Sequence, residues 1–315
     1  MDLTKVPIVS ICIPAYKQTE YLRVLLNSIR EQRFDDFEIV LTDDTPGNEV
    51  ESVVKEYEFS QEVRYHRNDP QQGSPGNWNA TLALARGRYL KLMHHDDAFN
   101  SPDSLSRMVN VMEEGKYDYL FCETYVKNVK FPDRNRINRI VKFNKFLKNP
   151  NRLFYGNSLG APSALMVRNH RFPGLEYDTK FIWLVDLEYY IRLMKASSNG
   201  TVVHEPLILT HDSADHQITE KVLGDFELRW KEQVMLYERI VPETSWFQRI
   251  LMDSLLVRIL QKERKTEEAL LNEFRQAPFL VRLYFKWSGN PLLNLLLRIF
   301  VRAIIFIRTQ LFKRT

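Results

Sequence analysis

The sequence predicts an α/β fold in which helices flank a mostly parallel β-sheet, followed by a helical C-terminal region. In roughly the first 125 residues, short apolar runs alternate with stretches in which apolar side chains recur at helical spacing. Such alternation is typical of parallel strands joined by crossover helices. Beyond about Thr219 the pattern is helical and amphipathic to the C-terminus.

Each element is predicted from its own pattern. Strands are expected where apolar residues run together and then stop at proline or polar residues, at residues 7–14, 37–44, 63–68, 88–97, 117–127 and 201–211. Helices are expected where apolar residues recur every three to four positions, at residues 19–32, 47–58, 77–87, 101–115 and 181–195. Gly87 and Gly115 end two of these helices. Residues 154–172 are expected to form mainly loops.

The composition is that of a globular protein with a basic tail. Hydrophobic residues make up 44% of the 315 positions and charged residues 27%. Cys12 and Cys122 are expected to be buried thiols, and residues 6–13 a first strand rather than an export signal. Residues 277–315 contain seven Lys/Arg and no Asp/Glu, which leaves 37 of the 44 basic residues against 40 acids elsewhere. This distribution argues against a general nucleic-acid surface.

Polar residues follow three of the expected strands. They are Pro14-Ala15-Tyr16, Asp43-Asp44 and the four residues from His94 to Asp97. Open α/β sheets bind ligands beyond the carboxyl ends of their strands. The sequence therefore predicts a site at this edge, and paired acids there suit a divalent cation with the diphosphate that it neutralises.

Three segments together resemble family 2 glycosyltransferases with the GT-A fold. They are VSICIPAYKQTEYLRVLLNSIREQRFDDFEIVLTDD, GNWNATLALARGRYLKLMHHDD and WLVDLEYYIRL, in the family's order and spacing over roughly residues 7–220. The resemblance implies a catalytic domain at residues 1–219. Its nucleotide-sugar half would cover about 1–125 and its acceptor half about 126–219, followed by a helical region at 220–315.

The resemblance also implies a donor site. The residues that match it are Pro14, Ala15, Tyr16, Asp44, Asn79, His95, Asp96 and Asp97. Tyr16 offers a ring face to the nucleoside, and Asp44 can accept a hydrogen bond from the base. Taken alone, Tyr16 is better explained as a rim aromatic, and Asp43-Asp44 could equally cap the next helix. Asn79 is expected either to position a loop over the diphosphate or to bond locally.

The family's metal-binding DxD motif falls on His94-His95-Asp96. Asp96 matches the usual metal ligand, and His94 stands in place of the first aspartate. Mn²⁺ or Mg²⁺ is the expected ion, with the imidazole favouring Mn²⁺. A zinc site is the alternative, although adjacent histidines on a strand point to opposite faces. His211, Asp212, His216 and Gln217 lie in the loop after the last strand, where the resemblance implies a further histidine on the metal or the diphosphate. His211 and His216 are the two candidates, and His216 is preferred.

Asp186 matches the family's catalytic base. Sugar transfer with inversion needs one carboxylate beside the acceptor hydroxyl. Glu188 is the alternate base, and an acid that complements the helix dipole is the structural alternative for Asp186. The residues expected at the acceptor are Gly160, Pro162, Ser163, Trp183 and Glu188.

Residues 292–312 predict an amphipathic helix. Its polar residues fall within roughly a 140° arc when the chain is stepped at 100° per residue. Three arginines make spanning a bilayer unfavourable, so a helix lying on an anionic membrane surface is preferred. Residues 279–287 add aromatic anchors. The alternative is packing against the catalytic domain or a second copy, which would make the protein a homo-oligomer through its C-terminal helices.

These features predict an inverting glycosyltransferase that moves a sugar from a nucleotide diphosphate donor to an acceptor hydroxyl. A UDP-sugar is the default donor, with dTDP, GDP and CDP open. The expected acceptor is a lipid-linked oligosaccharide of surface polysaccharide or lipopolysaccharide synthesis, at the cytoplasmic face of the inner membrane. One alternative is an inactive binding module with this fold, suggested by His94. The other is a nucleotidyltransferase or metal hydrolase, disfavoured because residues 14–20 contain no glycine.

Overall fold

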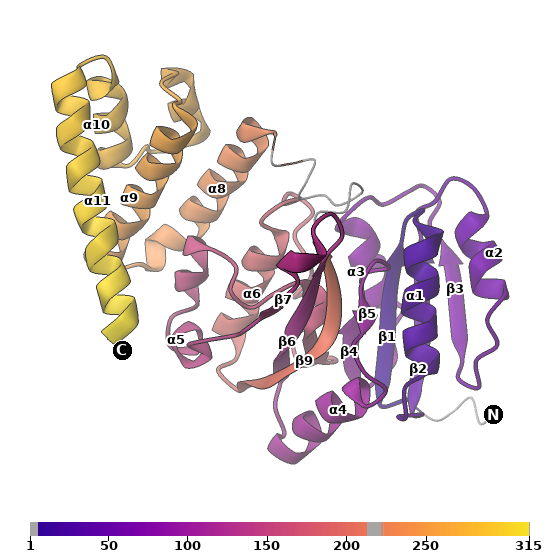
Figure 1. Ribbon diagram of the computed structural model, residues 1–315. Coiled ribbons are helices and arrows are strands. Elements are labelled where there is room, and N and C mark those ends of the chain that lie inside the picture. The colour runs from indigo at the N-terminus through magenta and orange to yellow at the C-terminus, as the bar shows by residue number, and fades with distance from the viewer. Residues whose placement is uncertain (1–5, 213–221, 223, 315) are drawn as a thin grey trace. The chain divides into compact units, whose positions relative to one another are not determined.

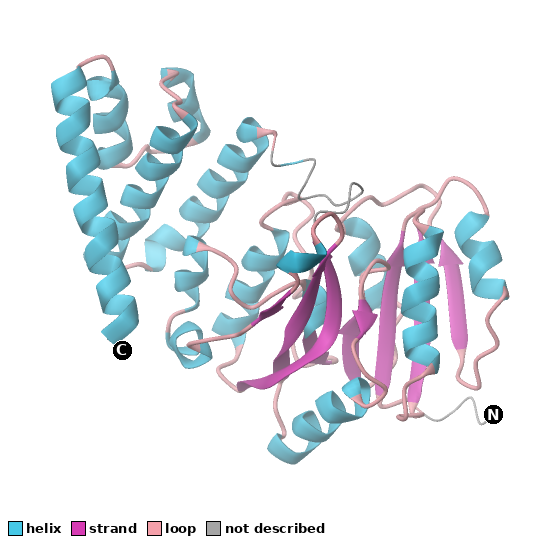
Figure 2. Cartoon of the chain, viewed as in Figure 1, coloured by secondary structure: helices cyan, strands magenta, loops and turns pink. Residues whose placement is uncertain are grey.

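The computed structural model describes residues 6–212, 222 and 224–314. The chain forms two compact units, Met1–Gly224 and Asp225–Thr315. Figure 2 shows all the described strands in the first unit, while the second is built of helices. The domain boundary expected after residue 219 lies outside the described residues.

The first unit is built around one nine-stranded mixed sheet in the order β3-β2-β1-β4-β8-β6-β9-β5, with β7 paired to β6. The first four strands are mutually parallel, as predicted. They are β1 (Val9–Ala15), β2 (Phe37–Asp43), β3 (Val63–Arg67) and β4 (Tyr89–Leu92). The remaining strands are β5 (Ala98–Phe99), β6 (Tyr119–Asn128), β7 (Arg136–Asn138), β8 (Leu165–Arg168) and β9 (Gly200–Asp212).

The second half of the sheet departs from the prediction. Strand β8 lies in the stretch that was expected to be loops, and it runs antiparallel to both of its neighbours, β4 and β6. Strands β5 and β7 are also antiparallel to their partners, whereas β6 and β9 are parallel. The sheet is therefore parallel on the side of β1 and mixed on the other.

Helices cover both faces of this sheet. They are α1 (Thr19–Arg30), α2 (Glu49–Lys55), α3 (Gly76–Ala83), α4 (Ser104–Gly115), α5 (Phe143–Lys148) and α6 (Val185–Ala196). Short 3₁₀ turns lie at η1 (Pro132–Arg134), η2 (Pro150–Tyr155) and η3 (Pro162–Ala164). Apolar residues of α1, α2 and α4 bury one face of β1 and β2 in a common core. Helix α3 lies on the other face (Figure 1), where the Thr81 hydroxyl donates to the Val40 carbonyl.

Gly87 lets β4 pack directly beside β1. Its amide donates to the Ser10 hydroxyl at 2.7 Å, and a Cβ atom at this position would lie 2.5 Å from the Ser10 backbone nitrogen. A side chain there is excluded by backbone atoms, so only glycine fits. Because β4 then pairs with β1 from Val9↔Tyr89 onward, its carboxyl end reaches the same edge as those of β1 and β2.

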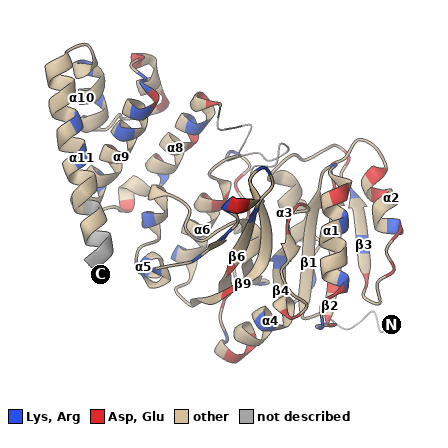
Figure 3. Cartoon of the chain, in the orientation of Figure 1, with Lys and Arg blue, Asp and Glu red and all other residues tan. Residues whose placement is uncertain are grey.

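The second unit consists of α8 (Phe226–Ile240), α9 (Trp246–Glu263), α10 (Phe279–Ser288) and α11 (Pro291–Arg314), with turns η4 (Val241–Glu243) and η5 (Glu268–Glu273). A capping box between Ser245 and Gln248 starts α9. Helix α11 packs on α9 and α10. Figure 3 shows basic but no acidic residues on α10 and α11. Within the described residues, every helix is too short or too polar to cross a bilayer.

Candidate active site

Asp44 organises the tip of β2. Its carboxylate is buried and accepts hydrogen bonds from Asn68 Nδ2 at 2.6 Å and from the backbone amides of Gln72 and Gly73 at 3.1 and 2.7 Å. Its own amide donates to the Ala15 carbonyl at 3.0 Å, which ties the ends of β1 and β2 together. Asp44 therefore folds residues 68–73 across the strand ends. A carboxylate has about four acceptor positions, so this arrangement is compatible with a further bond to a ligand.

Two buried asparagines at this edge were missed by the sequence analysis. Asn77 Nδ2 donates to the Ala15 carbonyl at 3.0 Å, and Asn77 Oδ1 accepts from Asn68 Nδ2 at 2.8 Å. The sequence instead predicted a site role for Asn79, which lies on the same helix. Asn79 instead exchanges two hydrogen bonds with the backbone of Tyr177, at 2.8 and 2.9 Å, and so joins α3 to the segment before α6.

Tyr16 lies at the rim of the same edge. Its side chain is 45% exposed, and Lys17 Nζ lies 5.1 Å from the ring centroid. The Lys17 amide donates to the Thr45 hydroxyl at 2.7 Å, which holds the end of β1 beside the residues that follow β2. Pro14 and Ala15 are the last two residues of β1. The residues predicted to hold the nucleoside therefore lie at one edge of the sheet, with the Tyr16 side chain partly exposed to solvent.

The turn after β4 gathers three ligand-type side chains. One ligand atom each of His94, Asp96 and Asp97 lies within 4.8 Å of the other two. The Asp97 amide donates to the His94 carbonyl at 3.0 Å, which closes the turn. The imidazole of His95 is directed elsewhere, with Nδ1 3.3 Å from the Pro14 carbonyl. The two histidines follow β4, and their rings diverge, His94 toward the two aspartates and His95 toward Pro14, so they do not converge on one zinc ion.

The side chains of this cluster are of the types that bind divalent cations, and the raised pKa of Asp97 means that metal binding would release its proton. Burial lowers the pKa of the His94 imidazole to about 4, so the ring is neutral at pH 7. Its Nε2 is buried and has no hydrogen-bond partner in the described part of the chain. Burial, and then the charge of Asp96, raise the pKa of the Asp97 carboxyl well above its usual value. A neutral imidazole beside two crowded carboxyl groups matches the ligand preference of Mn²⁺ and similar ions.

Aromatic and histidine side chains surround the cluster. The centroids of the Trp78 and His94 rings lie 4.5 Å apart. His211 is the penultimate residue of β9 rather than part of the following loop. Its Nδ1 donates to the Asp96 carbonyl at 2.5 Å, so β9 is tied to the turn. Asp212 instead pairs with Arg136 at 2.8 Å. His216 and Gln217 lie outside the described residues.

Asp186 is held at the first turn of α6. Its Oδ2 accepts a hydrogen bond from Asn157 Nδ2 at 2.6 Å, and its Oδ1 accepts from the Leu187 amide at 2.8 Å. The Asn157 Oδ1 accepts the amides of Leu159 and Gly160, at 2.9 and 3.0 Å. Asn157 was not predicted as a site residue. It fixes both the candidate base and the loop that leads to η3.

Gly160 and Ser163 link Asp186 to the turn after β4. The Gly160 carbonyl accepts from Asn157 Nδ2 at 2.9 Å and from the Tyr190 hydroxyl at 3.1 Å. Its φ of +100° is a conformation that only glycine adopts easily. The Ser163 hydroxyl, in the 3₁₀ turn that Pro162 begins, accepts from the His94 amide at 3.0 Å.

One hydroxyl group lies near both acidic sites. Burial raises the pKa of Tyr190 well above its usual value, and the negative charges of Asp186 and Asp97 raise it further. The two carboxyl groups, distant in sequence, are therefore both within electrostatic range of Tyr190. The hydrogen-bonded loop of residues 157–163 also contacts both segments, through Asn157 to Asp186 and through Ser163 to the His94 amide.

Glu188 and Trp183 have different surroundings from Asp186. Glu188 is completely buried, and its two oxygens pair with Arg192 at 2.6 and 2.7 Å. A carboxylate held in a buried ion pair is a poor general base, so the geometry favours Asp186. Trp183 is half-buried in the turn before α6. The acceptor roles expected for both remain predictions.

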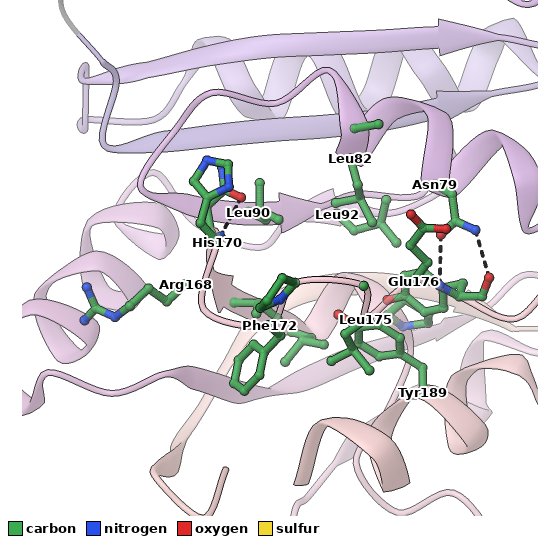
Figure 4. A pocket seen from close by; sticks show the side chains of 18 residues that line it. Asn79, Leu82, Leu90, Leu92, Arg168, His170, Phe172, Leu175, Glu176 and Tyr189 are labelled. Carbon is green, nitrogen blue, oxygen red and sulfur yellow. Dashed lines mark hydrogen bonds between the residues drawn. The ribbon is translucent and has the colours of Figure 1, made fainter. Parts of the chain in front are cut away.

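A cavity of about 190 Å³ lies on the α3 side of the sheet (Figure 4). Its lining residues include Leu82 of α3, Leu90 and Leu92 of β4, Tyr189 of α6, and Phe172, which lies between β8 and α6. Figure 4 also shows the two hydrogen bonds between the Asn79 side chain and the backbone of Tyr177, which is another lining residue. The cavity is mainly apolar and is lined by residues other than the acidic cluster and Asp186.

Comparison with known proteins identifies similar sequences and folds. A family model described as "Glycosyl transferase family 2" matches residues 10–172. Abequosyltransferase RfbV of Salmonella typhimurium is 26% identical, covering 66% of this chain and 68% of its own length. The structure of S. aureus TarS 1–349 with UDP superposes with a TM-score of 0.59 at 18% identity, covering 94% of this chain and 87% of that one.

A second solved structure shares the fold. The mannosyltransferase PcManGT from Pyrobaculum calidifontis, in complex with GDP-Man and Mn²⁺, superposes with a TM-score of 0.57 at 14% identity. The match covers 96% of this chain and 85% of that one. These likenesses confirm the GT-A fold expected from the sequence.

Replacing Asp96 by Asn is expected to weaken the binding of Mn²⁺ by at least about tenfold, roughly 1.4 kcal/mol. The substitution keeps the shape of the side chain and removes the charge that a hard cation requires. Isothermal titration with MnCl₂ alone measures the change. Glu114→Gln, an acid on the surface of α4, is the matched control and should bind Mn²⁺ as the wild type does. Equal affinity in Asp96→Asn would show that the ion binds elsewhere.

Proposed function

The chain belongs to glycosyltransferase family 2, and on this premise we propose that it transfers a sugar, with inversion, from a nucleotide diphosphate donor to an acceptor hydroxyl. The observation that carries this proposal is the loop of residues 157–163, which contacts Asp186 through Asn157 and the turn after β4 through Ser163. A single base beside a diphosphate site is what an inverting transfer needs. The sugar is attacked from the side opposite the departing diphosphate.

Asp186 is proposed to take the proton from the acceptor hydroxyl as the hydroxyl oxygen attacks the anomeric carbon. Asn157 donates to Oδ2 and the Leu187 amide to Oδ1, so both oxygens carry hydrogen bonds that favour the ionised carboxylate. Gly160, Pro162 and Ser163 lie between Asp186 and the turn after β4, where an acceptor sugar would reach both.

His94, Asp96 and Asp97 are proposed to hold a divalent cation, with Mn²⁺ preferred over Mg²⁺. When bound, the cation would neutralise charge on the departing nucleoside diphosphate. The Mn²⁺ complex of PcManGT supports this choice. His216 remains the preferred additional ligand. His211 contributes by holding the Asp96 carbonyl, which fixes the turn that carries the ligands.

The donor is proposed to be a UDP-sugar. The strand-end residues Tyr16 and Asp44 would bind the nucleoside. Asn68 donates a hydrogen bond to Asp44 and is itself bonded to Asn77. The complexes of TarS with UDP and of PcManGT with GDP-Man support a nucleoside diphosphate sugar as the class of donor. His95 and Asn79 are proposed to position the loops over the diphosphate.

The acceptor is proposed to be a lipid-linked glycan of bacterial surface polysaccharide synthesis, met at the cytoplasmic face of the inner membrane. Similarity to RfbV and to poly(ribitol-phosphate) β-N-acetylglucosaminyltransferase TarS supports the glycan class. The second unit supports the membrane. Leu297 and Val301 of α11 are buried, while seven other large apolar residues of this helix are at least 49% exposed: Leu292, Leu295, Leu296, Ile299, Phe300, Phe306 and Ile307.

The exposed apolar residues of α11 form one face of the helix. At 100° per residue they fall within about 140°, and Arg298 and Arg302 lie exposed along one border. Only part of the apolar surface of α11 is used in packing. An apolar face bordered by cations, in a tail that lacks acids, fits the interface of an anionic bilayer better than a second copy of the same basic surface.

Asp186→Asn is expected to lower kcat by about 10²–10⁴-fold, because the amide cannot accept the acceptor's proton. Binding of the donor with Mn²⁺ should stay within about twofold of wild type. The assay is turnover of sugar nucleotides on lipid-linked acceptors, with donor affinity measured by calorimetry. Glu188→Gln, the neighbouring acid in the buried ion pair, should lower thermal stability rather than the turnover of folded enzyme. Full activity in Asp186→Asn would refute the proposed base. Donor binding without turnover in the wild type would favour an inactive binding module.

Leu295→Gln with Ile299→Gln is expected to reduce flotation with phosphatidylglycerol vesicles by at least about tenfold, because two apolar side chains no longer enter the interface. Arg298→Gln with Arg302→Gln should weaken binding to these anionic vesicles only. Val24→Gln, at an exposed valine of α1, is the control and should float as the wild type does. Unchanged flotation of the leucine–isoleucine variant, or its conversion from dimer to monomer, would contradict the membrane assignment.

A further inference from the structure

Lys91 is a completely buried lysine in the middle of β4. Its relative exposure is 0%, and it shares a side of the strand with Tyr89 and Met93, both buried in the core. Removing an ammonium group from water is costly unless the group is well paired. Burial lowers the pKa of Lys91 to about 8, which expresses that cost, and the side chain remains mainly charged at pH 7. Packing alone therefore does not explain a lysine at this position.

The ammonium group donates a hydrogen bond to the Ser163 carbonyl. Ser163 also contacts the acidic turn through its hydroxyl, which accepts from the His94 amide at 3.0 Å and hydrogen-bonds with the Asp97 carboxyl. One residue thus connects Lys91 with two members of the cluster. The connection runs from the core of the sheet to the ligands at its edge.

Backbone pairing does not supply this connection. Strands β4 and β8 pair only at Tyr89↔Arg168 and Leu90↔Val167. Beyond this pair, Met166 and Leu165 of β8 pair with β6, and η3 precedes them, so the β4–β8 ladder ends before it reaches the cluster. Lys91 near the end of β4, and the His94 amide in the turn that follows, both hydrogen-bond to Ser163 of η3.

We propose that Lys91 is a positioning residue whose ammonium fixes Ser163, and through Ser163 the turn of residues 94–97, in the conformation that binds a divalent cation and a nucleoside diphosphate. This inference rests on the proposed function, because it takes that turn as the diphosphate site. The long side chain provides a donor where the backbone has none. Lys91 is also within electrostatic range of Asp97.

Lys91→Met tests the proposal because methionine keeps the length of the side chain and removes the donor and the charge. The probe is whichever of UDP, GDP, CDP and dTDP the wild type binds best with Mn²⁺. We expect nucleotide affinity to fall about tenfold while the melting temperature stays the same or rises, since the desolvation cost of the lysine is gone. Met166→Leu, a volume-conserving change in the same core, is the control and should leave the affinity unchanged.

A double-mutant cycle with Ser163→Ala identifies the route of the effect. If Lys91 acts through the Ser163 hydroxyl, adding Lys91→Met to Ser163→Ala should weaken binding little further, so the two effects are not additive. Additive effects, or a Lys91→Met variant that binds as tightly as wild type or more tightly, would overturn the proposal. Tighter binding would mean that the positive charge of Lys91 weakens Mn²⁺ binding by more than the positioning of Ser163 strengthens it.

Two further outcomes keep the test decisive. Should Lys91→Met fail to fold, Lys91→Gln replaces it in the same cycle; glutamine keeps a donor for the Ser163 carbonyl, so it should bind nucleotide more tightly than Ser163→Ala. Equal or weaker binding would overturn the positioning role. A wild type that binds none of the four nucleotides with Mn²⁺ would refute the proposed function itself, whereas normal binding by every variant would refute only the role of Lys91.

Discussion

The contact between residues 157–163 and two separate acidic segments is the constraint on which the site depends. Asn157 holds Asp186 at 2.6 Å, and Ser163 holds the turn after β4 through the His94 amide at 3.0 Å. Carboxyl groups brought near one another in a buried setting oppose ionisation, as the raised pKa of Asp97 shows. The donors that hold these segments are mostly neutral amides and hydroxyls. Asn157 and Ser163 are neutral donors, in contrast to Arg192, which holds Glu188 in an ion pair.

The sheet explains why segments so far apart in sequence can meet. Because β1, β2 and β4 are parallel, their carboxyl ends lie at one edge. This could be predicted from apolar runs that are followed by polar residues at Pro14, at Asp43-Asp44 and at His94 to Asp97, although β4 ends at Leu92, earlier than the expected strand at 88–97. The fold class and the family could likewise be predicted from these runs and from the order of three motifs. Strand β8 could not. It has four residues within a stretch rich in glycine, proline and asparagine, and its antiparallel place between β4 and β6 depends on tertiary pairing that no local pattern encodes.

Some of the site residues could likewise be predicted from the sequence, and others could not. The sequence pointed to His94, Asp96 and Asp97, which the structure brings together, because ligand-type residues after a strand are a local signal. Asn77 and Asn157 were missed because an asparagine acquires its role only from distant partners, here the Ala15 carbonyl and Asp186. Lys91 did carry a signal, since a lysine inside an otherwise apolar strand conflicts with the pattern around it. Its partner, the Ser163 carbonyl, lies 72 residues further along the chain and could not be predicted.

The most direct test of the account is the position of a bound metal relative to Asp186. Crystals grown with Mn²⁺ and UDP, or whichever nucleoside diphosphate binds best, would locate the ion by its anomalous scattering. The account predicts one strong peak within coordination distance of the residues 94–97 turn, with the diphosphate between that peak and the Asp186 carboxylate. A peak at any other group of ligands, or a diphosphate separated from Asp186 by the sheet, would contradict it.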